Sequence, residues 1–347
     1  MPAAAGREEE EAALGWCNAC RVTATIGLLG DVMLGRGVAE RLGEIQPEEV
    51  WSPGLREVCR SCDLVICNLE CCISRRGEQT RRIPGKPFYF RGPPAAVESL
   101  RAIGVSVAGL ANNHALDFEG AALLDTLELL GEAGIAAAGA GVDEAAARRG
   151  AIVEAQGMRI GLLAVSDHPA EYAARPGTPG IAHADLTRAL PAWLAAELER
   201  LRSECELVVA FPHWGPNMSP EPARWQVKAA ARMLDAGATL VAGHSAHVFH
   251  GVGWADGAPL LFDLGDALDD YAIDPSLRND LGVLALWRPG DAEAPIELVG
   301  LRLDYCRTGL ARDADAEWIA ERLAAACRVL GSSVERVDEQ RFRISPA

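Results

Sequence analysis

Short apolar runs alternate with longer segments of helical periodicity along most of the chain. The runs are rich in leucine and β-branched residues and are too short for helices, so each predicts a buried strand. Seven such runs lie at residues 24–30, 63–69, 104–110, 159–165, 206–211, 238–243 and 259–265. Helical segments separate them, such as residues 119–134, which end in a glycine stop signal, and residues 190–205. Because strands alternate with helices, we predict a layered α/β fold.

The two ends of the chain depart from this pattern. Residues 1–21 carry an acidic block and little apolar periodicity, so we expect a disordered acidic tail. Residues 306–347 contain an amphipathic helical segment at 315–331 and a strand-like stretch at 341–345. We therefore predict a main domain over residues 22–305, followed by a C-terminal helix and strand extension that packs on the core.

Polar side chains gather at the points where the apolar runs end. In an α/β sheet, ligands bind beyond the carboxyl ends of the strands, so these side chains are expected to share one edge of the fold. Five different runs contribute to the set, and it holds carboxylates, amides and imidazoles. Its members are Asp31, Asn68, Glu70, Asn112, Asn113, His114, His213, His244 and His247.

The stretch "VAGHSAHVFHG" contains three of the seven histidines of the chain. Imidazole is the commonest metal-binding side chain, so closely spaced histidines at the end of an apolar run indicate a metal site. Each element has an alternative reading: Asp31 as a helix cap, Glu70 as a solvated acid, and the "ANNH" asparagines as turn formers. Their joint occurrence after successive strands favours the metal site.

Composition narrows the class of protein. With 347 residues and 49% hydrophobic content, the chain buries enough surface to fold without disulfide bonds. A formal net charge of −16 argues against a nucleic-acid backbone or an anionic membrane surface as the general partner. An anionic substrate would therefore need a local basic patch.

The sequence also bears on location. The N-terminus has an acidic block where a secretory signal would have a basic end, and no stretch reaches the length of about 18 apolar residues that a membrane span needs. We therefore expect a cytoplasmic protein without a membrane span. Ten cysteines fit a reducing compartment. The pairs Cys17/Cys20 and Cys59/Cys62 lie farther apart than zinc-ribbon pairs usually do, which favours packing as their role.

An ordered series of motifs carries a family resemblance. "GDVMLGR", "NLE", "LANNHALDFEGAAL", "HWG", "GHSAHV" and "LFDLGD" occur in this order between about residues 24 and 290. The series resembles that of the bacterial poly-γ-glutamate capsule synthesis family (CapA-like), which is similar to the calcineurin-like metallophosphoesterases. The resemblance implies a sandwich of two mixed β-sheets flanked by helices, with a metal centre at one edge.

The resemblance also implies which residues act at this centre. It implies two divalent transition-metal ions, with Mn, Fe or Zn as the candidates. Their ligands would be Asp31, Glu70 and His247 for one ion, and Glu70, Asn113, His213 and His244 for the other. His114, next to Asn113, falls where the phosphoesterases keep a histidine near the leaving group, so these two residues are the catalytic candidates.

Three positions depart from the metallophosphoesterase pattern. Met33 stands where a histidine usually follows the first aspartate, which weakens the expected first metal site. Glu70 replaces a shorter aspartate, and "GDA" at 265–267 replaces the usual Gly-Asn-Phe.

The candidates for substrate binding lie partly outside the motifs. Residues 81–94, "RRIPGKPFYFRGPP", concentrate positive charge in a Gly/Pro-rich loop, where an arginine fork could hold phosphate or carboxylate. A merely solvated loop is the equal alternative. Asn68 and His250 are further substrate-side candidates, and His168 and His250 are also candidates for groups that surround the ligands. The cationic candidates of the loop are Arg81, Arg82, Lys86 and Arg91.

Two classes of function follow from these patterns. The first is a metal-dependent hydrolase of a phosphoester, with an amide of a polyglutamate-like substrate as second choice. The second is a non-catalytic accessory protein that binds an anionic polymer or a ligase partner in poly-γ-glutamate synthesis. The retained imidazoles favour the enzyme, whereas the loss of a histidine at Met33 favours the accessory protein.

Overall fold

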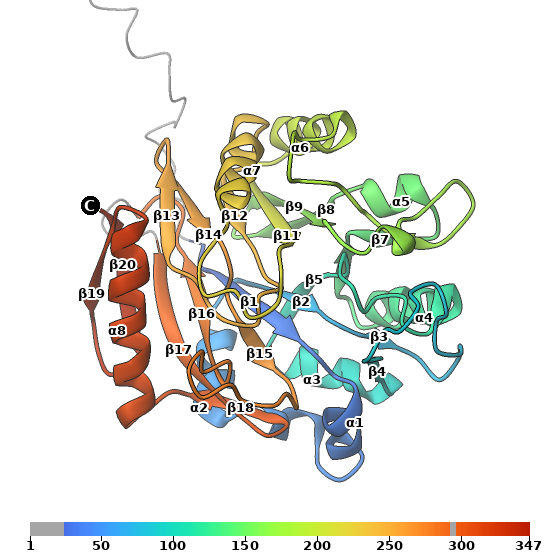
Figure 1. Ribbon diagram of the computed structural model, residues 1–347, viewed down its shortest axis with the longest axis horizontal. Coiled ribbons are helices and arrows are strands. Elements are labelled where there is room, and N and C mark those ends of the chain that lie inside the picture. Colours follow the sequence, from blue (N-terminus) through green and yellow to red (C-terminus); the bar gives the residue numbers. More distant parts are fainter. Residues whose placement is uncertain (1–23, 292–295) are drawn as a thin grey trace, which may run out of the picture.

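The computed structural model describes residues 24–291 and 296–347. The predicted acidic tail, residues 1–21, and its cysteines Cys17 and Cys20 lie outside the described residues. Within the described part, two mixed β-sheets lie face to face and helices cover them (Figure 1). The predicted α/β sandwich of two mixed sheets flanked by helices is therefore confirmed.

The larger sheet has ten strands in the order β19-β20-β17-β16-β1-β2-β5-β6, with β15 paired to β1 and β18 paired to β17. Strands β1, β2, β5 and β6 run parallel, while β16, β17, β20 and β19 alternate in direction. The bounds are β1 Ile26–Val32, β2 Leu64–Leu69, β5 Val105–Gly109, β6 Ala136–Ala138, β15 Asp266–Leu268, β16 Leu281–Trp287, β17 Ile296–Asp304, β18 Arg307–Leu310, β19 Ser332–Arg336 and β20 Arg341–Pro346.

The smaller sheet has six strands in the order β13-β14-β12-β11-β9-β8, and its four central strands run parallel. Its strands are β8 Ala151–Ala155, β9 Met158–Ser166, β11 Leu207–His213, β12 Leu240–Ala242, β13 Val252–Ala255 and β14 Ala258–Leu261. Two short pairs join β3 (Cys72–Ile73) to β4 (Arg91–Gly92) and β7 (Ala140–Gly141) to β10 (Gly180–Ile181).

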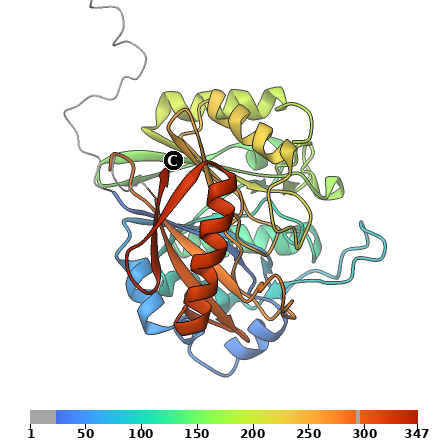
Figure 2. The ribbon, with the colours of Figure 1, turned by 60° about the vertical axis from the view of Figure 1, so that its left-hand side comes forward.

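The helices lie around this sandwich. Helices α6 and α7 cover the outer face of the smaller sheet, and α8 packs against β13, β17 and β19 along the side where the two sheets meet (Figure 2). The helices are α1 Arg36–Leu42, α2 Pro53–Arg60, α3 Val97–Ala102, α4 Glu119–Glu132, α5 Glu144–Arg148, α6 Ala192–Glu204, α7 Arg224–Asp235 and α8 Asp313–Val329, with short 3-10 turns at η1 Pro47–Val50, η2 Pro94–Ala96 and η3 Ala170–Tyr172.

Two apolar clusters stabilise the layers. The larger one lies between the sheets, where Leu28 of β1 belongs to the same buried cluster as Phe211 of β11 and Leu240 of β12. The smaller one joins Leu163 of β9 to Leu198 of α6 beneath the outer helices. Burial of apolar surface on both faces explains why the central strands are uninterrupted apolar runs rather than alternating ones.

Each of the seven apolar runs overlaps a strand of one of the two sheets. Strands β15 to β20 were not among these runs, although β16 and β17 complete one half of the larger sheet. Residues 306–347 supply β18, α8, β19 and β20, and β20 pairs with β17.

The described cysteines are free thiols, and all of them except Cys62 are buried. Burial raises the pKa of Cys59 to about 12 and that of Cys62 to about 11, so both remain neutral thiols at neutral pH. None of the helices in the described ranges combines the length and the apolar character that a bilayer-crossing segment requires.

Candidate metal centre

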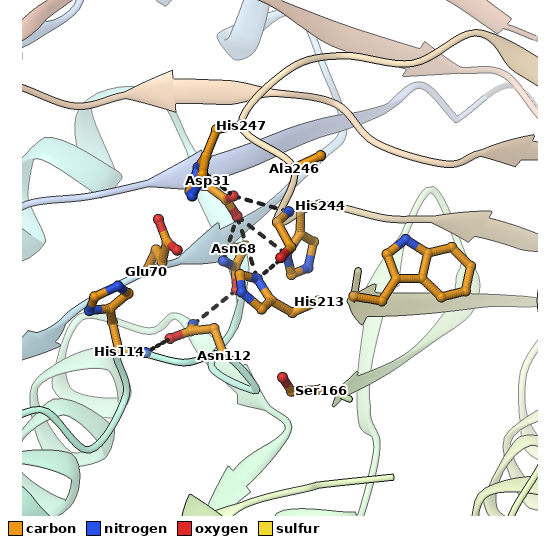
Figure 3. A network of polar contacts seen from close by, with 12 residues as sticks. Asp31, Asn68, Glu70, Asn112, His114, Ser166, His213, His244, Ala246 and His247 are labelled. Atoms are coloured by element: carbon orange, nitrogen blue, oxygen red, sulfur yellow. Dashed lines mark hydrogen bonds and ion pairs between the residues drawn. The ribbon is translucent and has the colours of Figure 1, made fainter. Parts of the chain in front are cut away.

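The carboxyl ends of strands from both sheets meet at one edge of the sandwich (Figure 3). Asp31 lies near the end of β1 and Glu70 directly follows β2, both in the larger sheet. His213 ends β11 and His244 follows β12, both in the smaller sheet. All four side chains are buried, with at most 1% of each residue exposed. The geometry thus brings carboxylates from one sheet against imidazoles from the other.

Asp31, His213 and His244 form the first group of potential ligands. The Nδ1 atoms of the two histidines lie 2.9 Å apart. From Asp31 Oδ1, the Nδ1 atom of His244 is at 3.3 Å and that of His213 is at 3.9 Å. Two imidazole nitrogens that face each other need a proton or a cation between them. Burial and the neighbouring His244 hold the pKa of His213 well below its usual value, so this ring is neutral and keeps a nitrogen lone pair with which it can bind a metal cation.

Asp31, Glu70, His247 and Asp266 form the second group, in which the potential ligand atoms lie within 4.8 Å of one another. His247 Nδ1 is 2.8 Å from Asp266 Oδ1 and 3.5 Å from Asp31 Oδ2. Asp31 therefore directs Oδ1 toward the first group and Oδ2 toward the second. A carboxylate placed in this way can bridge two ions.

The histidine-rich segment bends around Asp31. The backbone N–H of Ser245 donates to Asp31 Oδ2 at 3.2 Å, and that of Ala246 donates to Asp263 Oδ2 at 2.8 Å. His247 follows in the left-handed region, with a φ of 59°. This turn explains how two histidines only three residues apart reach different ligand groups.

The structure groups the expected ligands differently from the resemblance. It brings together Asp31, Glu70, His213, His244 and His247, but the residue shared by both groups is Asp31 rather than Glu70. The difference arises from the position of Asp31 in the fold. Asp31 belongs to β1 in the middle of the larger sheet, where Oδ1 faces His244 of the first group and Oδ2 faces His247 of the second group.

Asn113, an expected ligand and catalytic candidate, belongs to neither group. Its Oδ1 atom is nevertheless buried and has no hydrogen-bond partner in the described part of the chain. An amide oxygen in this state is available to a ligand, because an unpaired buried acceptor is costly.

Asp266 is a member of the second group that the sequence analysis did not assign, although it lies in the motif "LFDLGD". Strand β15 pairs with β1, and Asp266 stands opposite Asp31 in this pairing. Met33, where a histidine was expected, is fully buried, and its sulfur accepts the N–H of Gly35. The lack of a histidine at position 33 was expected to weaken this metal site, and Asp266 adds a potential ligand atom to it.

The electrostatics of the site favour a cation. Burial, reinforced by Asp31, raises the pKa of Glu70 well above its usual value, and burial also raises that of Asp266. Burial alone would lower the pKa of His247, but the carboxylates of Asp266 and Glu70 raise it well above its usual value. Within the described residues, several buried polar atoms lack partners, namely Glu70 Oε1, His213 Nε2, His244 Nε2 and Asp266 Oδ2. Mixed imidazole and carboxylate ligands in this state suit a transition-metal ion.

Asn68, expected on the substrate side, lies behind Asp31 instead. Its Nδ2 donates to Asp31 Oδ1 at 2.7 Å, and its Oδ1 accepts from Asn112 Nδ2 at 3.1 Å. Asn112 Oδ1 in turn accepts the N–H of His114 at 3.0 Å. This chain of amides orients Asp31 and links it to the loop that carries His114.

His114 is held by a carboxylate that sequence reasoning missed. Its Nδ1 lies 2.6 Å from Asp117 Oδ2, and its ring stacks on Phe90 with 3.8 Å between centroids. Asp117 also accepts from the N–H of Phe90, the hydroxyl of Tyr172 and the amine of Lys86. The Asp117 contact fixes the ring and leaves Nε2 on the other side, and Figure 3 shows the ring beside Glu70. Burial lowers the pKa of His114 to about 4, although Asp117 opposes this shift.

Three of the four cations expected to hold the substrate have internal partners. Lys86 donates to the backbone oxygen of Asn113 at 2.9 Å as well as to Asp117. Arg82 pairs with Glu119 at 2.6 Å. Arg91 donates to the carbonyl oxygens of residues 76 and 77 and lies over the ring of Phe118. These side chains order the loop.

The fourth loop cation, Arg81, is exposed. His250 is buried outside both ligand groups, with Nε2 at 2.8 Å from the backbone oxygen of Ser219. Burial lowers its pKa to about 4. His250 therefore anchors the loop that contains Ser219, and the structure gives it no place beside the ligands.

Comparisons with known proteins agree with the motif series. A family model described as bacterial capsule synthesis protein matches residues 25–271. A Mycobacterium tuberculosis protein named as a probable polyglutamine synthesis accessory protein is 31% identical, over 93% of this chain and 96% of its own length. The Bacillus subtilis PGA biosynthesis protein CapA is 26% identical, over 70% of this chain and 62% of its own length. A solved hypothetical protein from Thermus thermophilus covers 82% of this chain and 95% of its own, with 15% identity and a TM-score of 0.42.

Proposed function

The chain belongs to the bacterial capsule synthesis protein family, and from this premise we propose that it is a metal-dependent hydrolase of a phosphoester or of a polyglutamate-related anionic substrate. The observation that carries the proposal is the buried Asp31 carboxylate, whose two oxygens face two separate groups of potential ligands. This is the arrangement expected for two ions that share one carboxylate.

The residues around Asp31 have separate roles in this proposal. Asp31, His213 and His244 would hold one ion, and Asp31 with Glu70, His247 and Asp266 would hold the other. When bound, a pair of ions activates water as a nucleophile at neutral pH and clamps the attacked group.

Asn68 keeps Asp31 in the shared orientation through its 2.7 Å hydrogen bond. His114, fixed by Asp117, passes a proton to the leaving oxygen from Nε2. In the metal-free protein its lowered pKa keeps the ring neutral at pH 7. To donate from Nε2, the ring must first take up a proton from solvent, and the negative charge of the bound substrate favours this protonation.

A non-catalytic accessory role is the second candidate. Its support is the name of the Mycobacterium tuberculosis relative, a probable polyglutamine synthesis accessory protein. In this role, the same centre would bind an anionic polymer or a ligase partner and would not turn it over. Assays of the metal-loaded protein with a panel of phosphoesters and γ-glutamyl peptides separate the candidates: turnover supports the hydrolase, and saturable binding without turnover supports the accessory protein.

We expect Mn²⁺, Fe²⁺ or Zn²⁺ to raise the melting temperature of protein from which metal has been stripped. A ligand that binds only the folded state at about 100 times its dissociation constant adds about 2.7 kcal/mol to the free energy of unfolding. Ca²⁺ is the matched control, because the imidazoles of His213, His244 and His247 suit it poorly. Thermal melts with metal analysis measure the effect. If the protein bound none of the three ions and none of them raised its melting temperature, the metal proposal would be contradicted.

We expect this metal-induced shift to grow as the pH rises from about 6 to about 8 at a fixed metal concentration. Glu70, Asp266 and His247 have raised pKa values, so the metal must displace protons that they retain at lower pH. In the metal-free protein, the two carboxyl groups favour folding in their protonated forms. Their contribution to stability is present at low pH and is lost as the pH rises through their folded-state pKa values. A metal shift that stays constant or shrinks would contradict the assigned ligands.

A further inference from the structure

We propose that His168 binds the substrate on the side of the centre formed by the smaller sheet, by hydrogen-bonding a phosphoryl or carboxyl oxygen through Nε2. The proposal rests on the function proposed above and names a substrate contact of the same site. The family motifs quoted for the sequence do not include His168, and neither ligand group contains it.

Its place in the fold brings His168 to the first ligand group. Strand β9 pairs in parallel with β11, and Ser166, the last residue of β9, stands opposite His213. Figure 3 shows Ser166 close to His213 at the edge of the centre. His168 follows two residues later, and its ring centroid lies 5.3 Å from that of His213. The imidazole of His168 therefore borders the group formed by Asp31, His213 and His244.

A carboxylate fixes the direction of the His168 ring. Nδ1 contacts Oδ1 of Asp167, whose Oδ2 accepts the N–H of Gly215 at 3.1 Å. Gly215 belongs to the same "HWG" motif as His213, so this bond ties the His168 loop to a metal-ligand segment. The backbone N–H of His168 also donates to Ser166 Oγ at 3.3 Å. The ring is thus held from the Nδ1 side in the same manner as His114 by Asp117.

The other edge of the ring is available to a ligand. No hydrogen bond in the described part of the chain uses Nε2 of His168. The side chain of His168 is 36% exposed, whereas that of His213 is 1% exposed. A substrate can therefore reach His168 from solvent, while His213 is buried. Because Nδ1 is held by the carboxylate of Asp167, Nε2 is the ring nitrogen left to hydrogen-bond an oxygen of the substrate.

Three of the four loop cations that were expected to hold an anionic substrate do not offer it a donor. The expected substrate cations Lys86, Arg82 and Arg91 are directed to internal carboxylates or carbonyl oxygens. His168 offers a fixed donor next to the ligands, in addition to the ions themselves. Binding through such a contact contributes to affinity for the substrate without contributing to retention of the metal.

Binding of inorganic phosphate to the metal-loaded full chain tests the proposal, with isothermal titration calorimetry as the measurement. We expect His168→Ala to weaken phosphate binding about 10- to 100-fold, the usual effect of losing a charge-assisted hydrogen bond. Metal content should stay at the wild-type level. His168→Gln should restore part of the affinity, because its amide N–H reaches the position of Nε2, whereas the shorter His168→Asn should not.

His183→Ala is the matched control. Its Nε2 contacts the backbone oxygen of Asp167 at 3.2 Å, so it supports the same loop without facing the ligand group. We expect this variant to bind phosphate as the wild type does. If His183→Ala and His168→Ala weakened phosphate binding equally, the effect would come from loop order, and the proposal would be overturned.

The remaining outcomes are also decisive. Loss of metal in His168→Ala would make His168 a ligand, and unchanged phosphate affinity, or no phosphate binding by the wild type, would remove the proposed contact. A wild-type chain that takes up no metal would overturn both this proposal and the proposed function. A metal-loaded chain that binds phosphate through His168 but hydrolyses no substrate would overturn only the hydrolase.

Discussion

Asp31→Asn is expected to empty both ion positions and to reduce hydrolysis to the background rate. The substitution removes a negative charge and replaces one of the two carboxylate oxygens that face the ligand groups. Losing a residue that only orients a ligand costs about 10- to 100-fold in metal affinity, so losing a shared ligand should cost more. The metal should also no longer add the gain of about 2.7 kcal/mol in the free energy of unfolding that is expected for the wild type. Metal analysis, melting curves and turnover measure the three effects.

Two variants make this experiment specific. Asp280→Asn is the matched control, because Asp280 is also buried, lies outside both ligand groups and pairs with Arg278 instead. We expect it to keep its metal. Glu70→Gln tests which carboxylate is shared. If Asp31 is the shared carboxylate, this variant should lose only the second ion, because Glu70 belongs only to the second group. If Glu70→Gln emptied both positions while Asp31→Asn kept one, Glu70 would be the bridge that the family resemblance implies.

His114→Ala is expected to keep its metal and to lose about 10²- to 10⁴-fold in turnover, the usual contribution of a general acid or base. His114 is outside both ligand groups and is fixed by Asp117 at 2.6 Å. The defect should shrink for substrates with good leaving groups, because these need little protonation in the transition state. Steady-state kinetics across a series of aryl phosphoesters measure this dependence.

The comparison with other histidines decides the role. His244→Ala should lose metal and activity together, because His244 belongs to the first ligand group. His250→Ala should retain both, since His250 is buried but binds only a backbone oxygen. A His114→Ala variant that lost metal as readily as His244→Ala would identify His114 as a ligand. If both variants behaved as the wild type does, the accessory role would become the better account.

The strand ends could be predicted because burial acts locally on the sequence. A central strand covered on both faces must be apolar along its length, so a polar residue such as Asp31 or His213 marks the point where the strand reaches an edge. Parallel strands reach the same edge, which explains why five runs delivered polar residues to one place. The interpretation of residues 81–94 as a substrate loop lacked such a constraint. The partners of Arg82 and Lys86, Glu119 and Asp117, follow from how the loop packs on the following segment.

The sequence by itself determined the layered α/β class and the chemical types that meet at the centre, because apolar periodicity and the polar residues at the ends of the runs are local properties of the chain. Its ordered motifs carried the family resemblance, and that resemblance implied the sandwich of two sheets. Only the tertiary structure decided which carboxylate belongs to both groups of potential ligands and which residues complete these groups. Asp266 enters through the pairing of β15 with β1, and Asp31 faces both groups because the two sheets meet at its position. Whether one carboxylate can serve both groups depends on the distances between side-chain atoms. Such distances are set by strand register and by the packing of one sheet on another, and neither is encoded in the spacing of residues along the chain.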